Sequence, residues 1–142
     1  MAETAPRSPL VTIALLAAII ASGLLLRRFG PSAGLPFVVV KYGGSLLWGA
    51  MVYVGLTVAA SRRPAAPLAM IAGLIAACVE FSRLYHPSWL DAFRLTIPGA
   101  LLLGRVFSPW NLVAYGVGIL LGCLADLAAR RSYLASRRRS RC

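Results

Sequence analysis

The sequence predicts an all-α membrane protein, a bundle of four transmembrane helices with one short re-entrant or interfacial segment. Of its 142 residues, 59% are hydrophobic and 13% are charged, and the mean hydropathy of +0.77 excludes an ordinary water-soluble domain. Fifteen Lys and Arg residues outnumber four acids, and they lie between apolar runs or at the C-terminus, as in multi-pass proteins. Several apolar runs also approach the ~20 residues that a helix needs to cross a membrane.

Four runs reach or approach the length of a membrane span, and each is bounded by proline or charge. They are Leu10–Leu26, Phe37–Ala60, Ala65 to about Leu84, and Asn111–Ala129. The first run is longer than the apolar part of a usual signal peptide and offers no A-x-A cleavage site. We therefore interpret it as a retained anchor helix.

The stretch Leu95–Val106 is apolar but only 12 residues long, and it contains Pro98 and Gly99. It is too short to span, so we predict a re-entrant or interfacial segment. Cation counts favour a five-span alternative, with eleven cations inside against four outside, whereas four spans give nine against six. We follow length, because it is a geometric constraint and the charge rule is a bias.

Both models place the C-terminus in the cytoplasm. We expect residues 1–129 to form a single membrane domain and residues 130–142 to form a basic cytoplasmic tail. The six tail arginines determine topology, and they can also attract anionic lipid. The sequence contains one Lys and no nucleic-acid motif, so we expect no nucleic-acid partner.

Small residues on the fourth helix indicate where helices approach closely. Gly118 and Gly122 form a GxxxG pair, which we expect to pack against the small-residue face of the third helix. A homodimer seam is the alternative use of the same pattern. The sequence does not separate the two, and the oligomeric state stays open.

Glu80 is the strongest candidate functional residue, because ionisable groups are costly to place in a membrane. Counting 1.5 Å per residue from Arg63 puts it about 25 Å across, close to the opposite edge of the core. We expect its carboxylate to face the bundle interior. Arg83, three residues later, is either its ion-pair partner or a second ligand-facing charge.

The polar and aromatic stretch LYHPSWLDAFR follows the third helix. Ser88 and Asp91 match a helix-capping pattern, which offers a structural role for Asp91. The candidate ligand-binding residues are Glu80, Arg83, Tyr85, His86, Asp91, Arg94, Asn111 and Tyr115. They match no recognised catalytic or metal-ligand spacing, so we predict no catalytic residue, metal or cofactor.

A family resemblance is carried by the runs KYGGSLLWGAMVY, EFSRLYHPSWLDAFR and GALLLGRVFSPWNLVAYGVG. They resemble the domain of unknown function 2809 family, small bacterial inner-membrane proteins distantly similar to VanZ-type proteins. The resemblance covers about Val38–Gly122 and implies a multi-pass protein of the bacterial cytoplasmic membrane. It gives the motif positions Lys41, Tyr42, Trp48, Glu80, Phe81, Tyr85, Asp91, Arg94, Leu103, Gly104 and Tyr115.

Two positions depart from the family pattern, which has an acid in place of Ser45 and often in place of Asn111.

The family has no assigned activity, so three hypotheses stand. The first is a binding protein that holds a polar lipid headgroup or an envelope-active small molecule in an outward-facing cleft. The second is a membrane enzyme acting on headgroups through Glu80, His86 and Asp91. The third is a structural subunit of a membrane complex.

Overall fold

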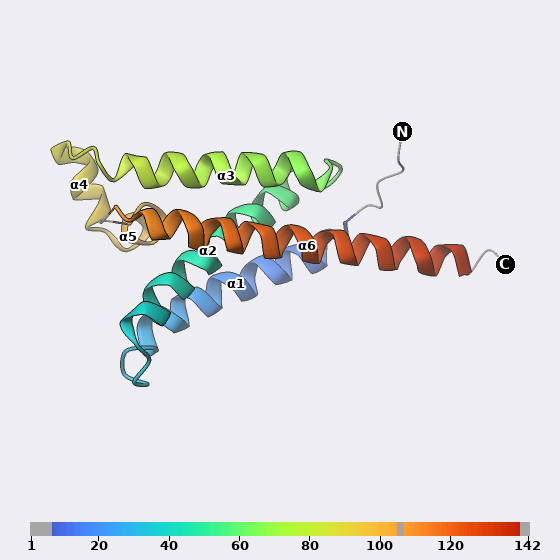
Figure 1. Ribbon diagram of the computed structural model, residues 1–142, viewed down its shortest axis with the longest axis horizontal. Coiled ribbons are helices and arrows are strands. Elements are labelled where there is room, and N and C mark those ends of the chain that lie inside the picture. The colour runs from blue at the N-terminus through green and yellow to red at the C-terminus, as the bar shows by residue number, and fades with distance from the viewer. Residues whose placement is uncertain (1–6, 105–106, 140–142) are drawn as a thin grey trace.

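A computed structural model describes residues 7–104 and 107–139, and the described residues form helices without a strand (Figure 1). The helices are α1 (Pro9–Phe29), α2 (Phe37–Ala59), α3 (Ala65–Ser82), α4 (Ser88–Arg94), α5 (Ile97–Leu102) and α6 (Pro109–Arg139). Among the described residues, α1, α2, α3 and α6 are long and apolar enough to span a membrane. The predicted fold class is confirmed, and the chain is a multi-pass membrane protein.

The long helices begin and end close to the predicted positions for local reasons. Proline at the first helical position starts α1 and α6, where its missing N–H costs nothing. Arg27 and Arg28 lie inside the last turn of α1, where cations complement the helix dipole, so the helix runs on to Phe29.

Helix α6 continues through residue 129, where the sequence placed the start of a separate tail. At 1.5 Å per residue its 31 residues measure about 46 Å, well beyond the ~30 Å hydrocarbon core. The basic stretch is thus a helical extension up to Arg139. The last three residues of the predicted tail lie outside the described part of the chain.

One end of the bundle is held together by Arg7. Its guanidinium donates two hydrogen bonds to the Asp126 carboxylate, at 2.9 and 2.7 Å, and one to the carbonyl of Ser61 at 2.8 Å. Arg130 lies 3.4 Å from the same carboxylate. The start of α1, the α2–α3 turn and the middle of α6 therefore meet at one end, on the right in Figure 1.

The opposite end carries α4 and α5, which lie between the end of α3 and the start of α6 (Figure 1). The Ser108 amide donates a 2.7 Å hydrogen bond to Glu80 in the last turn of α3. The chain leaves α3 and enters α6 at the same end, so α5, only six residues long, does not cross the bundle. This arrangement is that of four spans, and it disagrees with the five-span alternative.

The closest helix contact joins α2 to α6, because glycines remove the side chains that would separate them. A Cβ atom on Gly49 would lie 2.8 Å from Cα of Tyr115, and one on Gly118 would lie 2.9 Å from the Leu46 carbonyl carbon. A Cβ on Gly122 would lie 3.0 Å from the Tyr53 ring. The GxxxG face thus packs on α2, and the expected packing of this face on the third helix was wrong.

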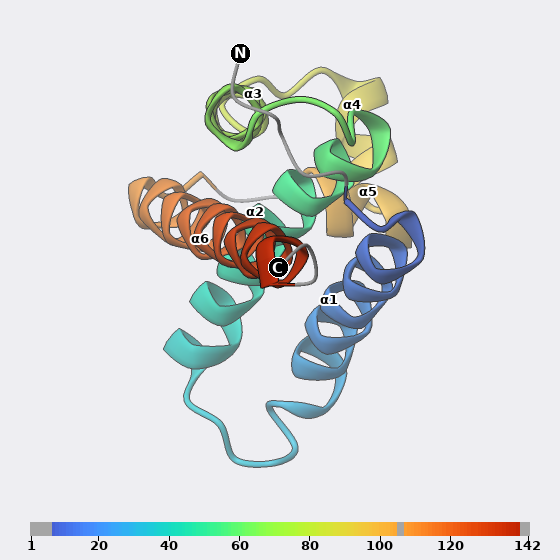
Figure 2. The same cartoon turned by 90° about the vertical axis from the view of Figure 1, so that its right-hand side faces the viewer.

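Helix α3 lies on another side of α6 and completes the core (Figure 2). The buried side chains come from α2, α3 and α6, and they include Tyr53, Val54, Leu68, Ala72, Ala76, Tyr115 and Ile119. Helix α1 contributes no fully buried residue to this core and packs along α2. Leu16 and Ile19 of α1 pack against the core, but most of its large apolar side chains are exposed, as expected for a helix that faces lipid.

Candidate functional site

Glu80 is fully buried at the end of α3, with none of its surface exposed. Its Oε1 atom accepts hydrogen bonds from the Ser108 amide at 2.7 Å and from Asn111 Nδ2 at 3.2 Å. Its Oε2 atom lies 2.6 Å from Nη1 of Arg83, an ion pair at 0% and 8% side-chain exposure. The prediction that Glu80 faces the bundle interior is confirmed, and its charge is compensated there.

Arg83, which lies just after α3, contacts three segments of the chain. Besides the pair with Glu80, its Nη2 donates to the Tyr115 hydroxyl at 2.8 Å, and its Nε donates to the carbonyl of Leu103. Gly104 follows with φ +66°, and a Cβ there would lie 2.6 Å from Arg83 Nη2. Glycine is required at this position by both its backbone conformation and the arginine beside it.

Ser45 extends the same contacts to α2. Its hydroxyl lies 3.2 Å from Oδ1 of Asn111, so the two positions that depart from the family pattern are hydrogen-bonded to each other. Trp48, one turn further along α2, packs against Tyr115 in a tilted arrangement, with ring centroids 4.8 Å apart. The Trp48 indole N–H is buried and has no partner among the described residues.

We call Ser45, Glu80, Arg83, Ser108, Asn111 and Tyr115 the buried polar network. Buried charges of this kind are tolerated when each is paired and hydrogen-bonded, and breaking one contact leaves others uncompensated. The network joins α2, α3, α6 and the segment before α6. Its members form hydrogen bonds and an ion pair with one another, so the arrangement is suited to holding the helix ends in place.

Arg94 forms a second, separate arrangement at the surface of the same end. It is 2% exposed, and its guanidinium donates to the carbonyls of Ser82 and Tyr85, the latter at 2.9 Å. These carbonyls lie at and just beyond the end of α3, where a cation is favoured. Arg94 also donates to Oδ1 of Asp91 at 3.0 Å, which fixes the carboxylate.

Asp91 does not cap α4. The helix begins at Ser88 itself, with Pro87 in the capping position and no side-chain cap, so the predicted capping pair was wrong. Instead Asp91 Oδ1 lies 3.2 Å from Nδ1 of His86. Desolvation alone would raise the pKa of Asp91, but hydrogen bonds and charge interactions with His86 and Arg94 outweigh it and hold the pKa below 3.8.

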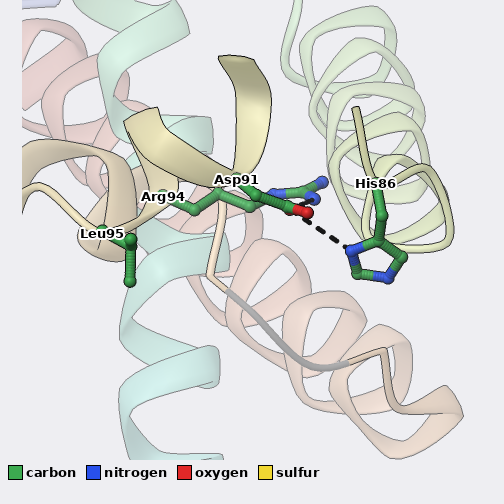
Figure 3. A pocket seen from close by; sticks show the side chains of 4 residues that line it. All are labelled: His86, Asp91, Arg94 and Leu95. Atoms are coloured by element: carbon green, nitrogen blue, oxygen red, sulfur yellow. Dashed lines mark hydrogen bonds and ion pairs between the residues drawn. The ribbon is translucent and has the colours of Figure 1, made fainter. Parts of the chain in front are cut away.

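A pocket of about 250 Å³ lies at this surface, lined by His86, Asp91, Arg94 and Leu95 (Figure 3). His86 comes from the segment after α3 and points toward Asp91, and the dashed line in Figure 3 marks the 3.2 Å contact between them. The side chains of His86 and Asp91 are 58% and 44% exposed. We call this recess the rim pocket.

The eight candidate ligand-binding residues therefore separate into two groups. Glu80, Arg83, Asn111 and Tyr115 belong to the buried polar network, whereas His86, Asp91 and Arg94 line the rim pocket. Tyr85 contributes its backbone carbonyl to Arg94, and its side chain is exposed. No grouping of three or more metal-ligating side chains occurs within the described ranges.

Three residues that take part in these contacts were not among the predicted ligand-binding residues. Ser108 binds Glu80 through its backbone amide, and a backbone contact cannot be predicted from the residue type. Ser45 and Trp48 were noted only as family positions. The only sequence signal for them was their helical spacing. They follow Lys41 by four and seven residues, which places them on one helix face with Lys41 and Gly49.

A family model described as "Protein of unknown function (DUF2809)" matches residues 35–119, more than half of the chain. The chain belongs to this family. The resemblance to the domain of unknown function 2809 family is thereby confirmed. The DUF2809 region runs from just before α2 into α6, so it contains the buried polar network and the rim pocket and leaves out α1. No solved structure matches the chain.

Proposed function

We propose that this DUF2809 protein is a non-enzymatic binding protein that holds a polar lipid headgroup, or a small envelope-active compound of the same chemistry, in the rim pocket. The observation that carries the proposal is the exposed His86–Asp91 pair, in which the buried Arg94 holds the Asp91 carboxylate in place by an ion pair. Pre-formed recesses with a few convergent polar groups are the usual form of ligand sites. A volume of about 250 Å³ suits a headgroup better than a whole lipid, since sites for drug-sized ligands measure ~300–1,000 Å³.

The charges around the rim pocket support a zwitterionic ligand. Asp91 Oδ2 receives no hydrogen bond from the described residues and is available to an ammonium group. Among the described residues, this end of the bundle has five cations against two acids. The cations are Arg27, Arg28, Lys41, Arg83 and Arg94, and the acids are Glu80 and Asp91. The surplus of positive charge favours a phosphate beside the ammonium.

The location that fits this proposal is a bacterial cytoplasmic membrane with the C-terminus inside. Four spans leave nine cations at the end that carries Arg7, Arg63 and the basic extension of α6, against six at the other end. The rim pocket then opens outward, toward the envelope. The basic extension of α6 begins at the inner surface, and each of its cations that lies close to the surface attracts anionic inner-leaflet lipid by about 1 kcal/mol.

The enzyme hypothesis has less support. His86 and Asp91 have the distance of a base and its orienting carboxylate, but the described residues that line the rim pocket include no hydroxyl or thiol. The structural-subunit hypothesis also weakens, because the GxxxG face is used against α2 within one chain. Binding is therefore the function that the geometry favours.

The proposal is tested by purifying the protein in mild detergent and identifying co-isolated lipids and small molecules by mass spectrometry. We expect an amine-bearing phospholipid or compound to be enriched over its share of the membrane extract. His86→Gln and Asp91→Asn should remove that enrichment. Ser88→Ala, an exposed change on the same segment outside the pocket lining, should preserve it.

Identical ligand profiles for the wild-type protein, His86→Gln and Asp91→Asn would refute binding at the rim pocket. Chemical conversion of the co-isolated lipid by the purified protein, lost in His86→Gln, would replace the proposal with the enzyme hypothesis.

A further inference from the structure

A second recess lies between the first two turns of α2 and the first two turns of α6. It has a volume of about 420 Å³ and is lined by Tyr42, Trp110, Val113 and Ala114. None of the described residues lines both this recess and the rim pocket. We call it the helix groove.

The packing of α2 against α6 explains why the helix groove exists. The two helices cross where Gly49 meets Tyr115, and they diverge toward their first turns (Figures 1 and 2). Tyr42 lies two turns before the crossing on α2, and Trp110 lies more than one turn before it on α6. Their rings stand where the helices have separated, so the opening has aromatic walls.

The walls of the helix groove are apolar and face outward. Trp110 is 68% exposed and Val113 is 56% exposed, although both belong to a membrane-spanning helix. In a bilayer such surfaces contact acyl chains, and Trp and Tyr favour the level of the headgroup boundary. Both rings lie near the ends of their helices, which matches that level.

A cation lies beside these walls. The Lys41 ammonium is 5.2 Å from the centroid of the Tyr42 ring and 5.7 Å from that of Phe37. Within the described ranges, Lys41 has no carboxylate partner. Glu80 pairs with Arg83, and Asp91 pairs with His86 and Arg94. The third acid, Asp126, pairs with Arg7 and Arg130. Its charge is available to an anion at the membrane surface.

We propose that the helix groove holds an acyl chain of an anionic phospholipid whose phosphate pairs with Lys41. The chain packs on Tyr42, Trp110 and Val113, while the phosphate lies at the ammonium group. Charge complementarity selects an anionic lipid, because a zwitterionic headgroup brings its own cation to Lys41. The site is independent of the rim pocket, and it stands whether or not that pocket binds a ligand.

Fluorescence quenching tests this site directly. Trp48→Phe and Trp89→Phe leave Trp110 as the only tryptophan, and Phe keeps an aromatic ring beside Tyr115. The protein is reconstituted in vesicles that contain brominated phosphatidylglycerol or brominated phosphatidylcholine in an unlabelled background. We expect brominated phosphatidylglycerol to reach half-maximal quenching at about one-fifth of the concentration, the preference that one cation close to the surface confers.

Lys41→Gln should equalise the two lipids, whereas Arg28→Gln, which removes an exposed cation of the same end, should not. Equal quenching by both lipids without a substitution would overturn the proposal, and so would a preference that survives Lys41→Gln. Absence of quenching by either lipid would also overturn it, since Trp110 would then be out of reach of acyl chains. If the single-tryptophan variant does not fold, native mass spectrometry of the wild-type protein and Lys41→Gln gives the same comparison through retained phosphatidylglycerol.

Discussion

Glu80 and Ser108 lie 28 positions apart, and a 2.7 Å hydrogen bond from the Ser108 amide to the Glu80 carboxylate joins them. This contact brings the end of α3 to the start of α6. The intervening segment must then return to the end of the bundle from which it left. The position of the rim pocket and the number of spans both follow from this closure.

Removing the Glu80 charge should destabilise the bundle strongly. Glu80→Gln leaves Arg83 buried at 8% side-chain exposure without its anionic partner. Loss of one partner of a buried pair costs about 3–5 kcal/mol, so we expect a large fall in the unfolding temperature in detergent. The double variant Glu80→Gln, Arg83→Gln should lose less than the sum of the two single changes. Strict additivity would show that the two residues do not interact.

Gly118→Ala should disrupt the contact between α2 and α6. The added Cβ would lie 2.9 Å from the carbonyl carbon of Leu46 and 3.0 Å from the amide nitrogen of Ala50, both backbone atoms that do not yield easily. Overpacking of this kind costs about 1–3 kcal/mol, measurable as a lower unfolding temperature.

Gly116→Ala on the same helix is the matched control. A Cβ there would meet nothing within 4 Å, so the change should be neutral or stabilising by up to about 1 kcal/mol through helix propensity. Equal losses for the two variants would mean that α6 does not approach α2 through Gly118.

The sequence was sufficient for properties that depend on local composition. Four apolar runs of membrane-spanning length became α1, α2, α3 and α6, because span length and helical backbone pairing are set residue by residue in lipid. The inward orientation of Glu80 followed from the cost of turning a carboxylate toward acyl chains.

Properties that depend on pairing between distant segments were not predictable. The helix that packs against Gly118 was predicted wrongly. Small residues occur on several helices, and their spacing does not show which helix lies opposite. Arg7 and Asp126 are 119 positions apart, and nothing local marks them as partners. The capping interpretation of Asp91 was wrong because α4 starts at Ser88, which places the serine inside the helix.

Lowering the pH should protonate the Asp91 carboxylate and weaken its ion pairs. Its pKa is lowered in the folded protein, so its stabilising contribution is complete above the ordinary value of 3.8 and is lost as pH falls through the lower, folded value. We expect the unfolding temperature of Asp91→Asn to lie below that of the wild-type protein at pH 7. The difference should shrink toward pH 3. A difference that is constant from pH 7 to pH 3 would mean that the charge of Asp91 contributes nothing.

Cysteine labelling tests the four-span arrangement. In a chain whose native cysteines are replaced by serine, Ser61→Cys and Ser132→Cys should react from the same side of the membrane, because Arg7 and Arg130 link these regions. Ser88→Cys should react from the opposite side. The five-span alternative places positions 61 and 132 on opposite sides, so that labelling result would overturn four spans.

The central claim is that the rim pocket selects a particular headgroup. The most direct measurement replaces Leu95 by a photo-crosslinking amino acid in membranes and identifies the captured lipid by mass spectrometry. Leu120, an exposed residue of α6, receives the same crosslinker and reports the lipid composition next to the bundle. We predict that one amine-bearing headgroup class dominates at position 95 and that His86→Gln abolishes the dominance. The same lipid composition at positions 95 and 120 would contradict the proposed function.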